Sequence, residues 1–559
     1  YAPEEQYSSK GNQGPWTDVY AMGATLYRCV TGELPPDSIM RVHNDTLKKP
    51  SELGVSLPPY VEQSILKALA VKAEDRFPTM AAFIEGLTGK NQVHFHHRTT
   101  AAPAGQTAGG SGERQWLWTK LRNKPLSVRI LALALCIAVS YLGGLWLQRR
   151  RGRRPALALA AAAALAPLLF FKYFNTLLGA YVPESVRAFS LLTPVGISFF
   201  TFKAVAYLAE VYKGALPPCR HFGRYALYVS FFPEVSMGPI QRPGDLMAQI
   251  GTPRAFDAGR AVRGAQLMLW GYFEKLVVAD NLAPYVSAGL DAPDLVMGLS
   301  VFLASVLYAV QLYADFAGYS HIAIGCMQLL GFDVPENFRA PYFSTSVKEF
   351  WNRWHISLSS WLRDYVYIPL GGSRCSTARC CVNLLITFLV SGLWHGTGLQ
   401  FAVWGLLHGA YLAVGRLTAP ARARLWRASH IPEQSAPARG LKMLVTFVLV
   451  WFGWVFFRAP TLSGALHLFA RMPDSFSLAP PALKNALAML GFNSGMLVRV
   501  GFACALLCAV DFAARRTGFS AWLAGRRKWF QAALCYVLVL AILFLAPIGA
   551  SPTPIYFQF

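Results

Sequence analysis

Two histidines in the most apolar part of this sequence could carry out acid–base chemistry. His395 closes the apolar run 383–394 and precedes a glycine, and His355 lies in a tryptophan-rich segment. A histidine titrates near neutral pH, so its ring can accept and return a proton during a reaction. Ionisable side chains at membrane depth are costly and usually functional. We expect His395 to be catalytic, whereas His355 could be catalytic or structural, and His408 is interpreted as structural.

The segment 348–365 should position His355. Its polar and aromatic side chains recur at helical spacing on two faces, which predicts one amphipathic helix rather than a simple membrane span. The polar face would carry Lys348, Asn352, His355, Ser359 and Arg363, and the other face Trp351, Trp354, Leu358, Trp361 and Tyr365.

The composition is that of an integral membrane protein. Apolar residues make up 54% of the chain and charged residues only 14%, whereas soluble domains carry about 25% charged residues. The net charge of +23 lies largely in short basic clusters between apolar runs, such as 149–154, 422–427 and 515–528. Clusters of this kind orient membrane proteins, so we do not expect nucleic-acid binding.

The ten cysteines are expected to be reduced and structural. Cys504 and Cys508 share a helix face, and Cys375, Cys380 and Cys381 flank a basic loop. No histidine or second cysteine pair completes a metal-binding set beside them, so no metal site is predicted.

Residues 1–90 differ in kind from the rest, because they are polar and contain no run long enough to span a membrane. Their Ala-Pro-Glu sequence at 2–4, together with 16–27 and the stretch EDRFPT at 74–79, resembles the C-terminal lobe of a bacterial Ser/Thr protein kinase. The resemblance implies a mainly α-helical fragment.

The kinase resemblance implies structural roles for three residues. Glu4 would pair with Arg76, and Asp18 would brace the catalytic loop. The motifs that carry out phosphoryl transfer in that family lie upstream of Ala-Pro-Glu, so the residues in hand are not expected to bind ATP by its mechanism.

Residues 91–127 are predicted to be a linker. Their first part contains His94, His96 and His97, which could bind a metal, although a plain linker is the favoured interpretation. The sequence TTAAPAGQTAGGSG that follows has few side chains able to pack in a core.

Residues 128–559 are expected to form an all-α polytopic membrane domain with about 10–12 transmembrane or re-entrant helices, since a crossing needs about 20 residues. Several apolar runs are short or broken by proline and glycine, which membranes tolerate where the backbone surrounds an internal chamber. The clearest runs are 130–147, 156–181, 188–210, 222–233, 264–280, 296–314, 383–394, 398–415, 442–457, 490–512 and 531–549.

Four further charged residues could contact a substrate. Asp315 lies in an apolar run, where a charge at the membrane centre costs about 2.5–3.5 kcal/mol. It could bind substrate, or it could form a structural salt bridge or helix cap. Arg363, Arg374 and Arg379 could bind phosphate groups or could simply set the orientation in the membrane.

A series of short motifs runs through the second half of the chain: FP and GPI at 232–240, ADNLAP at 279–284, DFAGYS at 315–320, PENF and PY at 335–342, EFWNRWHISL at 349–358, RDY at 363–365, IPLGG at 368–372 and LWHG at 393–396. Together they resemble the membrane-bound O-acyltransferase (MBOAT) family, and within it the alginate O-acetyltransferases. The likeness covers roughly 130–559 and includes the final residues 555–559.

The MBOAT resemblance implies acyl transfer across a membrane. His395 would be the general base that takes the proton from an acceptor hydroxyl, and His355 would orient the acceptor or stabilise the oxyanion. The loop 374–379 would be a phosphate clamp. Substrate-binding roles would fall to Asp315, Trp354, Arg363, Arg374 and Trp394.

The same resemblance implies the partners. The donor would be acetyl-CoA or a similar cytoplasmic acyl donor, which is a substrate, and no bound cofactor is expected. The acceptor would be an exported polysaccharide, reached through periplasmic acetylation partner proteins. The protein would lie in a bacterial inner membrane, in contact with its lipids.

Three alternatives remain open. The D-alanyl transferases of teichoic acid share the Phe-Trp-x-Arg-Trp-His block of 350–355, so the product could be another acylated cell-envelope polymer. The chain could instead be a membrane-anchored signalling kinase whose MBOAT-like part is a non-catalytic anchor. A transporter or lipid flippase is the third alternative, but the sequence contains no evident internal repeat to support it.

Overall fold

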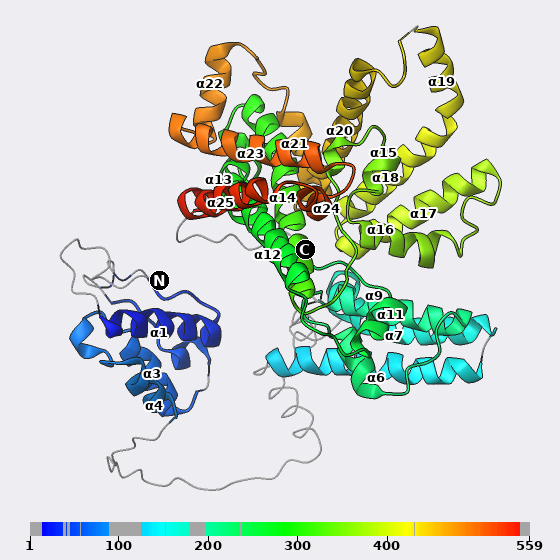
Figure 1. Cartoon of the computed structure of the whole chain (residues 1–559). Coiled ribbons are helices and arrows are strands. Elements are labelled where there is room, and N and C mark those ends of the chain that lie inside the picture. The colour runs from blue at the N-terminus through cyan, green and yellow to red at the C-terminus, as the bar shows by residue number, and fades with distance from the viewer. Residues whose placement is uncertain are drawn as a thin grey trace. The chain divides into compact units, whose positions relative to one another are not determined.

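The structure is a computed structural model that describes residues 14–36, 38, 41, 45–55, 57–88, 125–150, 152–178, 194, 196–234, 237–429 and 431–547. Every regular element in these ranges is a helix, which confirms the expected all-α class for them. Contacts between Cα atoms divide the chain into two compact units, 1–108 and 109–559 (Figure 1).

The N-terminal unit has a small helical core of its own. Tyr20, Tyr27, Ile65 and Phe83 are buried where its helices meet. The elements of this unit are α1 (Pro15–Thr31), η2 (Pro50–Leu53), α3 (Pro59–Ala68), η3 (Ala73–Asp75) and α4 (Met80–Thr88).

Arg76 is buried in this unit. Its guanidinium lies 4.6 Å from the centre of the Tyr20 ring and donates hydrogen bonds to two backbone carbonyls between α3 and η3. Glu4, the side chain of Asp18 and the histidine patch 94–97 lie outside the described residues, so the kinase-like roles of Glu4 and Asp18 stay predictions.

The second unit is that of a multi-pass membrane protein, as predicted. Seven helices within the described ranges are long and apolar enough to cross a membrane. They are Ile130–Arg149, Arg154–Phe174, Gly298–Leu329, Thr377–His395, Ala436–Arg458, Ser494–Ala514 and Lys528–Leu545. Other predicted runs form shorter or more polar helices, such as α9 (Ile197–Lys213) and α18 (Leu399–Leu417).

The helices of this unit form three neighbouring groups (Figure 1). The first group contains α6 (Pro125–Arg149), α7 (Arg154–Leu178) and α9, with α10 (Phe222–Val229) and α11 (Pro243–Ile250) packed on it. The second contains α12 (Ala258–Tyr272), η5 (Phe273–Ala279), α13 (Asp280–Leu290), η6 (Pro293–Leu295) and α14 (Gly298–Leu329).

The third group carries both candidate histidines. It contains η7 (Pro341–Phe343), α15 (Val347–Trp351), α16 (Ile356–Leu362), η8 (Arg363–Tyr367), α17 (Thr377–His395), α18, α19 (Ala419–Ala428) and α20 (Ala436–Arg458). The chain then returns to pack on the second group with α21 (Leu462–Arg471), α22 (Pro480–Met489), α23 (Ser494–Ala514), α24 (Phe519–Ala524) and α25 (Lys528–Leu545).

The single amphipathic helix predicted over 348–365 is wrong. The chain breaks at His355, whose backbone adopts a left-handed conformation with φ 41° and ψ 55°. The cause is a tertiary contact, because Asn337 accepts hydrogen bonds from the backbone N–H groups of Ile356 (2.9 Å) and Ser357 (3.2 Å). A continuous helix would have to use these two groups internally.

Glycines bring α12 and α14 into direct backbone contact. A Cβ atom on Gly271 would lie 2.5 Å from the carbonyl oxygen of Gly318, and one on Gly264 would lie 2.7 Å from that of Gly325. Small residues at such positions let helices approach closely in a membrane, where packing rather than hydrophobicity drives association. This seam fixes α14, which supplies Phe316 to the site.

Gly271→Ala should therefore destabilise the protein by about 1–3 kcal/mol, because a backbone carbonyl cannot yield to the added methyl group. The matched control is Gly501→Ala in α23, where an added Cβ would meet no atom within 4 Å. We expect the control to leave the midpoint of thermal unfolding in detergent unchanged or higher. An unchanged midpoint for Gly271→Ala would contradict the close approach of the two helices.

Candidate active site

His395 is the last residue of α17, and its ring is enclosed by aromatic side chains. The ring centres of Trp394, Trp404 and Phe457 lie 4.9, 5.2 and 5.1 Å away, and only 7% of the residue is exposed. An enclosure of this kind keeps bulk water from the ring, and catalytic sites use such exclusion to protect reactions that water would divert.

Backbone contacts between α17 and α18 hold the end of α17 in place. Gly392 lies against the carbonyl oxygen of Phe401, and Gly405 lies against that of Phe388, so closely that neither glycine could carry a side chain. Gly396, directly after His395, lies against the Phe401 ring in the same way. The position of His395 therefore depends on glycines in both helices.

His355 lies at the break between α15 and α16 and is 1% exposed. Its ring packs against Phe316 at 4.7 Å and lies 6.4 Å from the ring of Trp394, which in turn contacts His395. The structure thus brings together His355, Trp394 and His395, three of the predicted site residues.

Asn337 fixes the orientation of the His355 ring. Its side-chain oxygen accepts from His355 Nδ1 (3.2 Å) and from the Ser357 hydroxyl (2.9 Å), while its amide nitrogen donates to the Ser320 hydroxyl (3.0 Å). Because Nδ1 must carry the hydrogen in this arrangement, Nε2 presents a lone pair. Nε2 is buried and has no hydrogen-bond partner within the part of the chain that the structure describes.

Burial lowers the pKa of the His355 ring to about 3, so the ring is neutral near pH 7. A neutral ring with its hydrogen on Nδ1 can accept a hydrogen bond or proton at Nε2, but it cannot donate one there. Of the two roles predicted for His355, this geometry favours orienting an acceptor hydroxyl over stabilising an oxyanion.

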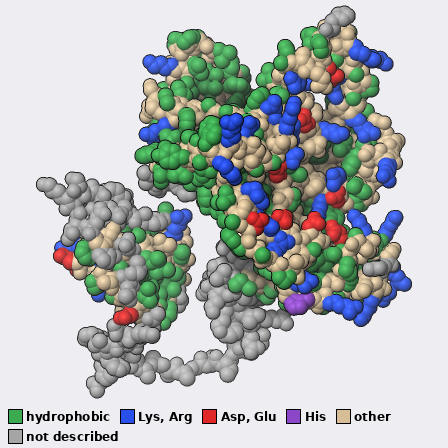
Figure 2. All heavy atoms as spheres, viewed as in Figure 1, with side chains coloured by type: hydrophobic (Ala, Val, Ile, Leu, Met, Phe, Trp, Pro, Cys, Tyr) green, Lys and Arg blue, Asp and Glu red, His purple; other side chains and the backbone are tan. Residues whose placement is uncertain are grey.

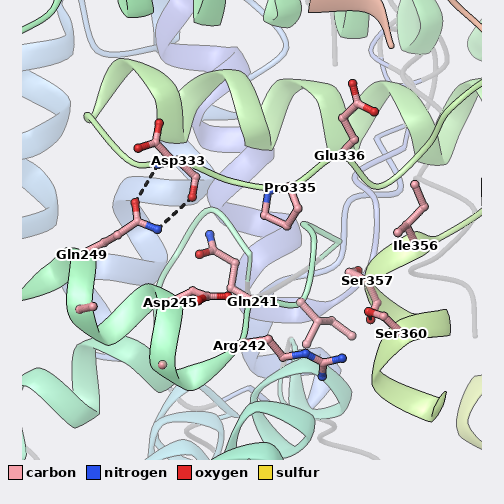
Figure 3. Close-up of a pocket in the computed structure, with 13 residues that line it drawn as sticks. Gln241, Arg242, Asp245, Gln249, Asp333, Pro335, Glu336, Ile356, Ser357 and Ser360 are labelled. Atoms are coloured by element: carbon pink, nitrogen blue, oxygen red, sulfur yellow. Dashed lines mark hydrogen bonds between the residues drawn. The ribbon is translucent and has the colours of Figure 1, made fainter. Parts of the chain in front are cut away.

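A cavity of about 490 Å³ lies beside His355 (Figure 3). It is bounded by α11, the turn before it, the segment after α14 and α16. Ser357, which shares the Asn337 oxygen with His355, lines it. The lining residues are Ile240, Gln241, Arg242, Gly244, Asp245, Ala248, Gln249, Asp333, Pro335, Glu336, Ile356, Ser357 and Ser360.

Two contacts define the walls of this cavity. Gln249 on α11 exchanges two hydrogen bonds with the backbone of Asp333, at 3.0 and 2.8 Å, as Figure 3 shows. Arg242 forms a 2.5 Å ion pair with Asp364 of η8, and its guanidinium extends toward Ser360 in Figure 3. Its Nη1 atom is buried without a hydrogen-bond partner among the residues described.

Three predicted substrate-binding residues do not line this cavity. Asp315 accepts a 2.6 Å hydrogen bond from Lys275 of η5, which supports the salt-bridge interpretation left open by the sequence. Arg363 is largely exposed and pairs with its neighbour Asp364. Arg374 is exposed before the start of α17, and the 19 residues of that helix span about 28 Å, so His395 lies a membrane's width away.

Trp354 and His408 belong to the aromatic packing around the site. The Trp354 ring lies 4.9 Å from Trp454 and 5.1 Å from Phe338, which also flanks His355. His408 is fully buried, and its ring centre lies 5.1 Å from that of Trp351, in keeping with a structural role.

No group of three or more potential metal-binding side chains occurs in the described ranges.

Two residues of the site were not predicted from the sequence. Asn337 lies in the PENF motif but had no assigned role. Lys172 of α7 donates to the backbone carbonyl of His395 at 2.8 Å and also to that of Trp394. The signal available in the sequence was the presence of a lysine inside an apolar run, a position that is usually functional.

Comparison with known proteins is consistent with this geometry. The sequence pattern of the MBOAT, membrane-bound O-acyltransferase family matches residues 219–457. A "Probable alginate O-acetylase" of Azotobacter vinelandii is 38% identical over 56% of this chain and 62% of its own length. The chain thus spans less than two thirds of that relative.

Two further relatives act on other cell-envelope polymers according to their names. A peptidoglycan O-acetyltransferase of Helicobacter pylori is 31% identical over 72% of this chain and 82% of its own length. A teichoic acid D-alanyltransferase of Bacillus subtilis is 30% identical over 45% of this chain and 66% of its own length. With the family pattern covering α10 to α20 and a relative matched over most of its length, the chain belongs to the membrane-bound O-acyltransferase family.

Proposed function

We propose that this protein transfers an acetyl group from cytoplasmic acetyl-CoA toward hydroxyl groups of an exported polysaccharide. The observation that carries the proposal is the pair of buried histidines on either side of Trp394, one of which presents an unpartnered Nε2 atom. Buried imidazoles in an aromatic enclosure suit a proton transfer that must be kept from water.

In the proposed reaction His395 is the general base. It takes the proton from the acceptor hydroxyl while the oxygen attacks the thioester carbonyl carbon. The C–S bond then breaks, and the proton returns from the imidazolium to the departing thiolate. The Nε2 atom of His355, whose lone pair is held in place by Asn337, would accept a hydrogen bond from a second hydroxyl group of the acceptor and so orient the acceptor.

The cavity beside His355 is our candidate for the donor path. It adjoins η8 through Arg242, which lies in the turn before α11 and forms an ion pair with Asp364 of η8. The hydroxyl of Tyr365 in η8 donates a 2.5 Å hydrogen bond to Glu210 near the end of α9. The loop after η8 leads into the exposed Arg374 and Arg379. The serine and glutamine side chains of the cavity suit the amides of a pantetheine arm.

The charge distribution supports a cytoplasmic location for this side. α17 begins and α18 ends on the same side of the unit, next to α19 with its exposed Arg422, Arg424 and Arg427. Figure 2 shows Lys and Arg side chains along the right edge of the view, where α17, α18 and α19 lie in Figure 1. Basic residues mark the cytoplasmic side of membrane proteins.

A second candidate function is transfer of a D-alanyl or other acyl group to a cell-envelope polymer. The match to the teichoic acid D-alanyltransferase favours it, and the histidine site would serve either acyl group. Comparing acetyl and D-alanyl donors in one assay separates the two.

The finer organisation is also proposed. It comprises a kinase C-lobe-like fragment at 1–90, a linker at 91–127 and an MBOAT membrane domain at 128–559 with about 10–12 transmembrane or re-entrant helices. The buried Arg76 of the first unit supports the kinase likeness. The proposed location is the bacterial inner membrane, with periplasmic acetylation proteins as partners.

His395→Ala should reduce transfer of labelled acetyl from acetyl-CoA to exported polysaccharide by at least about 100-fold, because general-base catalysis is lost. The control is His467→Ala, at an exposed histidine that pairs with Asp294 on the surface. Undiminished transfer by His395→Ala would refute the assigned base.

Asn337→Ala should both destabilise the protein and slow transfer. The buried donors of His355 and Ser357 would lose their acceptor, at a cost of about 1–3 kcal/mol. Asn352→Ala, at the exposed end of α15, is the matched control. Thermal unfolding and transfer rate are measured on the same samples, and a wild-type rate would contradict the orienting role of Asn337.

Ser360→Trp tests the donor path. The indole would fill part of the cavity, so KM for acetyl-CoA should rise at least about tenfold, the loss expected when contacts worth about 1.4 kcal/mol are removed. Ser463→Trp, on exposed α21, is the matched control. An unchanged KM for acetyl-CoA would exclude the cavity as the route of the donor.

A further inference from the structure

Lys172 is a lysine placed against the backbone of the candidate base. It follows the apolar part of α7, a helix that has no other acidic or basic residue after Arg154. Its ammonium donates to the carbonyl oxygen of His395 at 2.8 Å and to that of Trp394. The neighbouring Tyr173 donates from its hydroxyl to the carbonyl oxygen of Leu393.

These hydrogen bonds pair carbonyl groups at the C-terminal end of α17. The last carbonyls of a helix have no partner within the helix, and at membrane depth no water is available to replace it. Two adjacent residues of α7 supply donors to three successive carbonyls at the end of α17, where the chain turns through Gly396.

We propose that Lys172 is a positioning residue for His395, an inference that rests on the proposed function. By holding the carbonyls of residues 394 and 395, its ammonium fixes the backbone from which the catalytic ring projects. It thereby fixes the distance between that ring and a substrate in the site.

The charge of Lys172 has a use that a neutral donor would not have. Tyr173 shows that a hydroxyl can satisfy a carbonyl at this helix end, whereas a lysine at this depth is costly. A cation complements the partial negative charge of a helix C-terminus.

Three substitutions separate these contributions. Lys172→Arg keeps donors and charge, Lys172→Gln keeps a donor without charge, and Lys172→Met removes both. The full chain is assayed for labelled acetyl transfer as a function of acetyl-CoA concentration, and its thermal unfolding is measured in parallel. Lys484→Met, on the exposed face of α22, is the matched control.

We expect Lys172→Met to lower kcat by about 100-fold, the loss typical of a misplaced catalytic group, with little change in KM for acetyl-CoA. The Gln variant should also lose rate, because it lacks the charge that complements the end of α17, and Lys172→Arg should restore the wild-type rate. If the Met variant does not fold, the Gln variant supplies the test.

The outcomes distinguish this inference from the proposed function. If the wild type is inactive, or if His395→Ala is fully active, the proposed function fails and the inference falls with it. If the wild type is active and His395→Ala is not, but Lys172→Met and Lys172→Gln keep the wild-type kcat, only the role of Lys172 is overturned. Equal losses of kcat in the Arg and Met variants would also overturn it.

Discussion

Each charge and each backbone polar group at membrane depth must find its partner inside the protein, because the bilayer offers none. The structure meets this constraint with buried ion pairs between segments of the chain. Lys203 of α9 and Glu234, both 1% exposed, lie 2.7 Å apart. Lys275 of η5 bridges Asp280 and Asp315. Removing one member of such a pair would leave an uncompensated buried charge, so these contacts fix which helices are neighbours.

The candidate active site obeys the same constraint, because Asn337 pairs with the buried polar groups around His355. Asn337 gives one oxygen to His355 and Ser357 and its amide to Ser320, which leaves a single atom of the histidine available for a substrate. His355 itself adopts a left-handed backbone, an arrangement uncommon outside glycine that persists where the surroundings impose it. The hydrogen bonds to Asn337 that pair the polar groups around the ring therefore also break the helix between α15 and α16.

The class of the protein and the neighbourhood of His395 could be predicted from the sequence, because both depend on local properties. Apolar runs predicted the membrane helices, and His395 is adjacent to Trp394 in the chain. The break at His355 could not be predicted, since helical spacing carries no information about the hydrogen bonds that Ile356 and Ser357 donate to Asn337. Asp315 stayed ambiguous for the same reason: its partner Lys275 is 40 residues away.

The glycine contacts between α17 and α18 also have a mechanical consequence. Two helices that touch backbone to backbone at Gly392 and Gly405 cannot slide or rotate past each other without a collision. The hairpin of α17 and α18, which carries His395, is therefore rigid. Any movement that admits a bulky thioester would therefore involve other contacts, such as those between α11 and the segment after α14. There Gln249 donates one hydrogen bond to the backbone of Asp333 and accepts another from it.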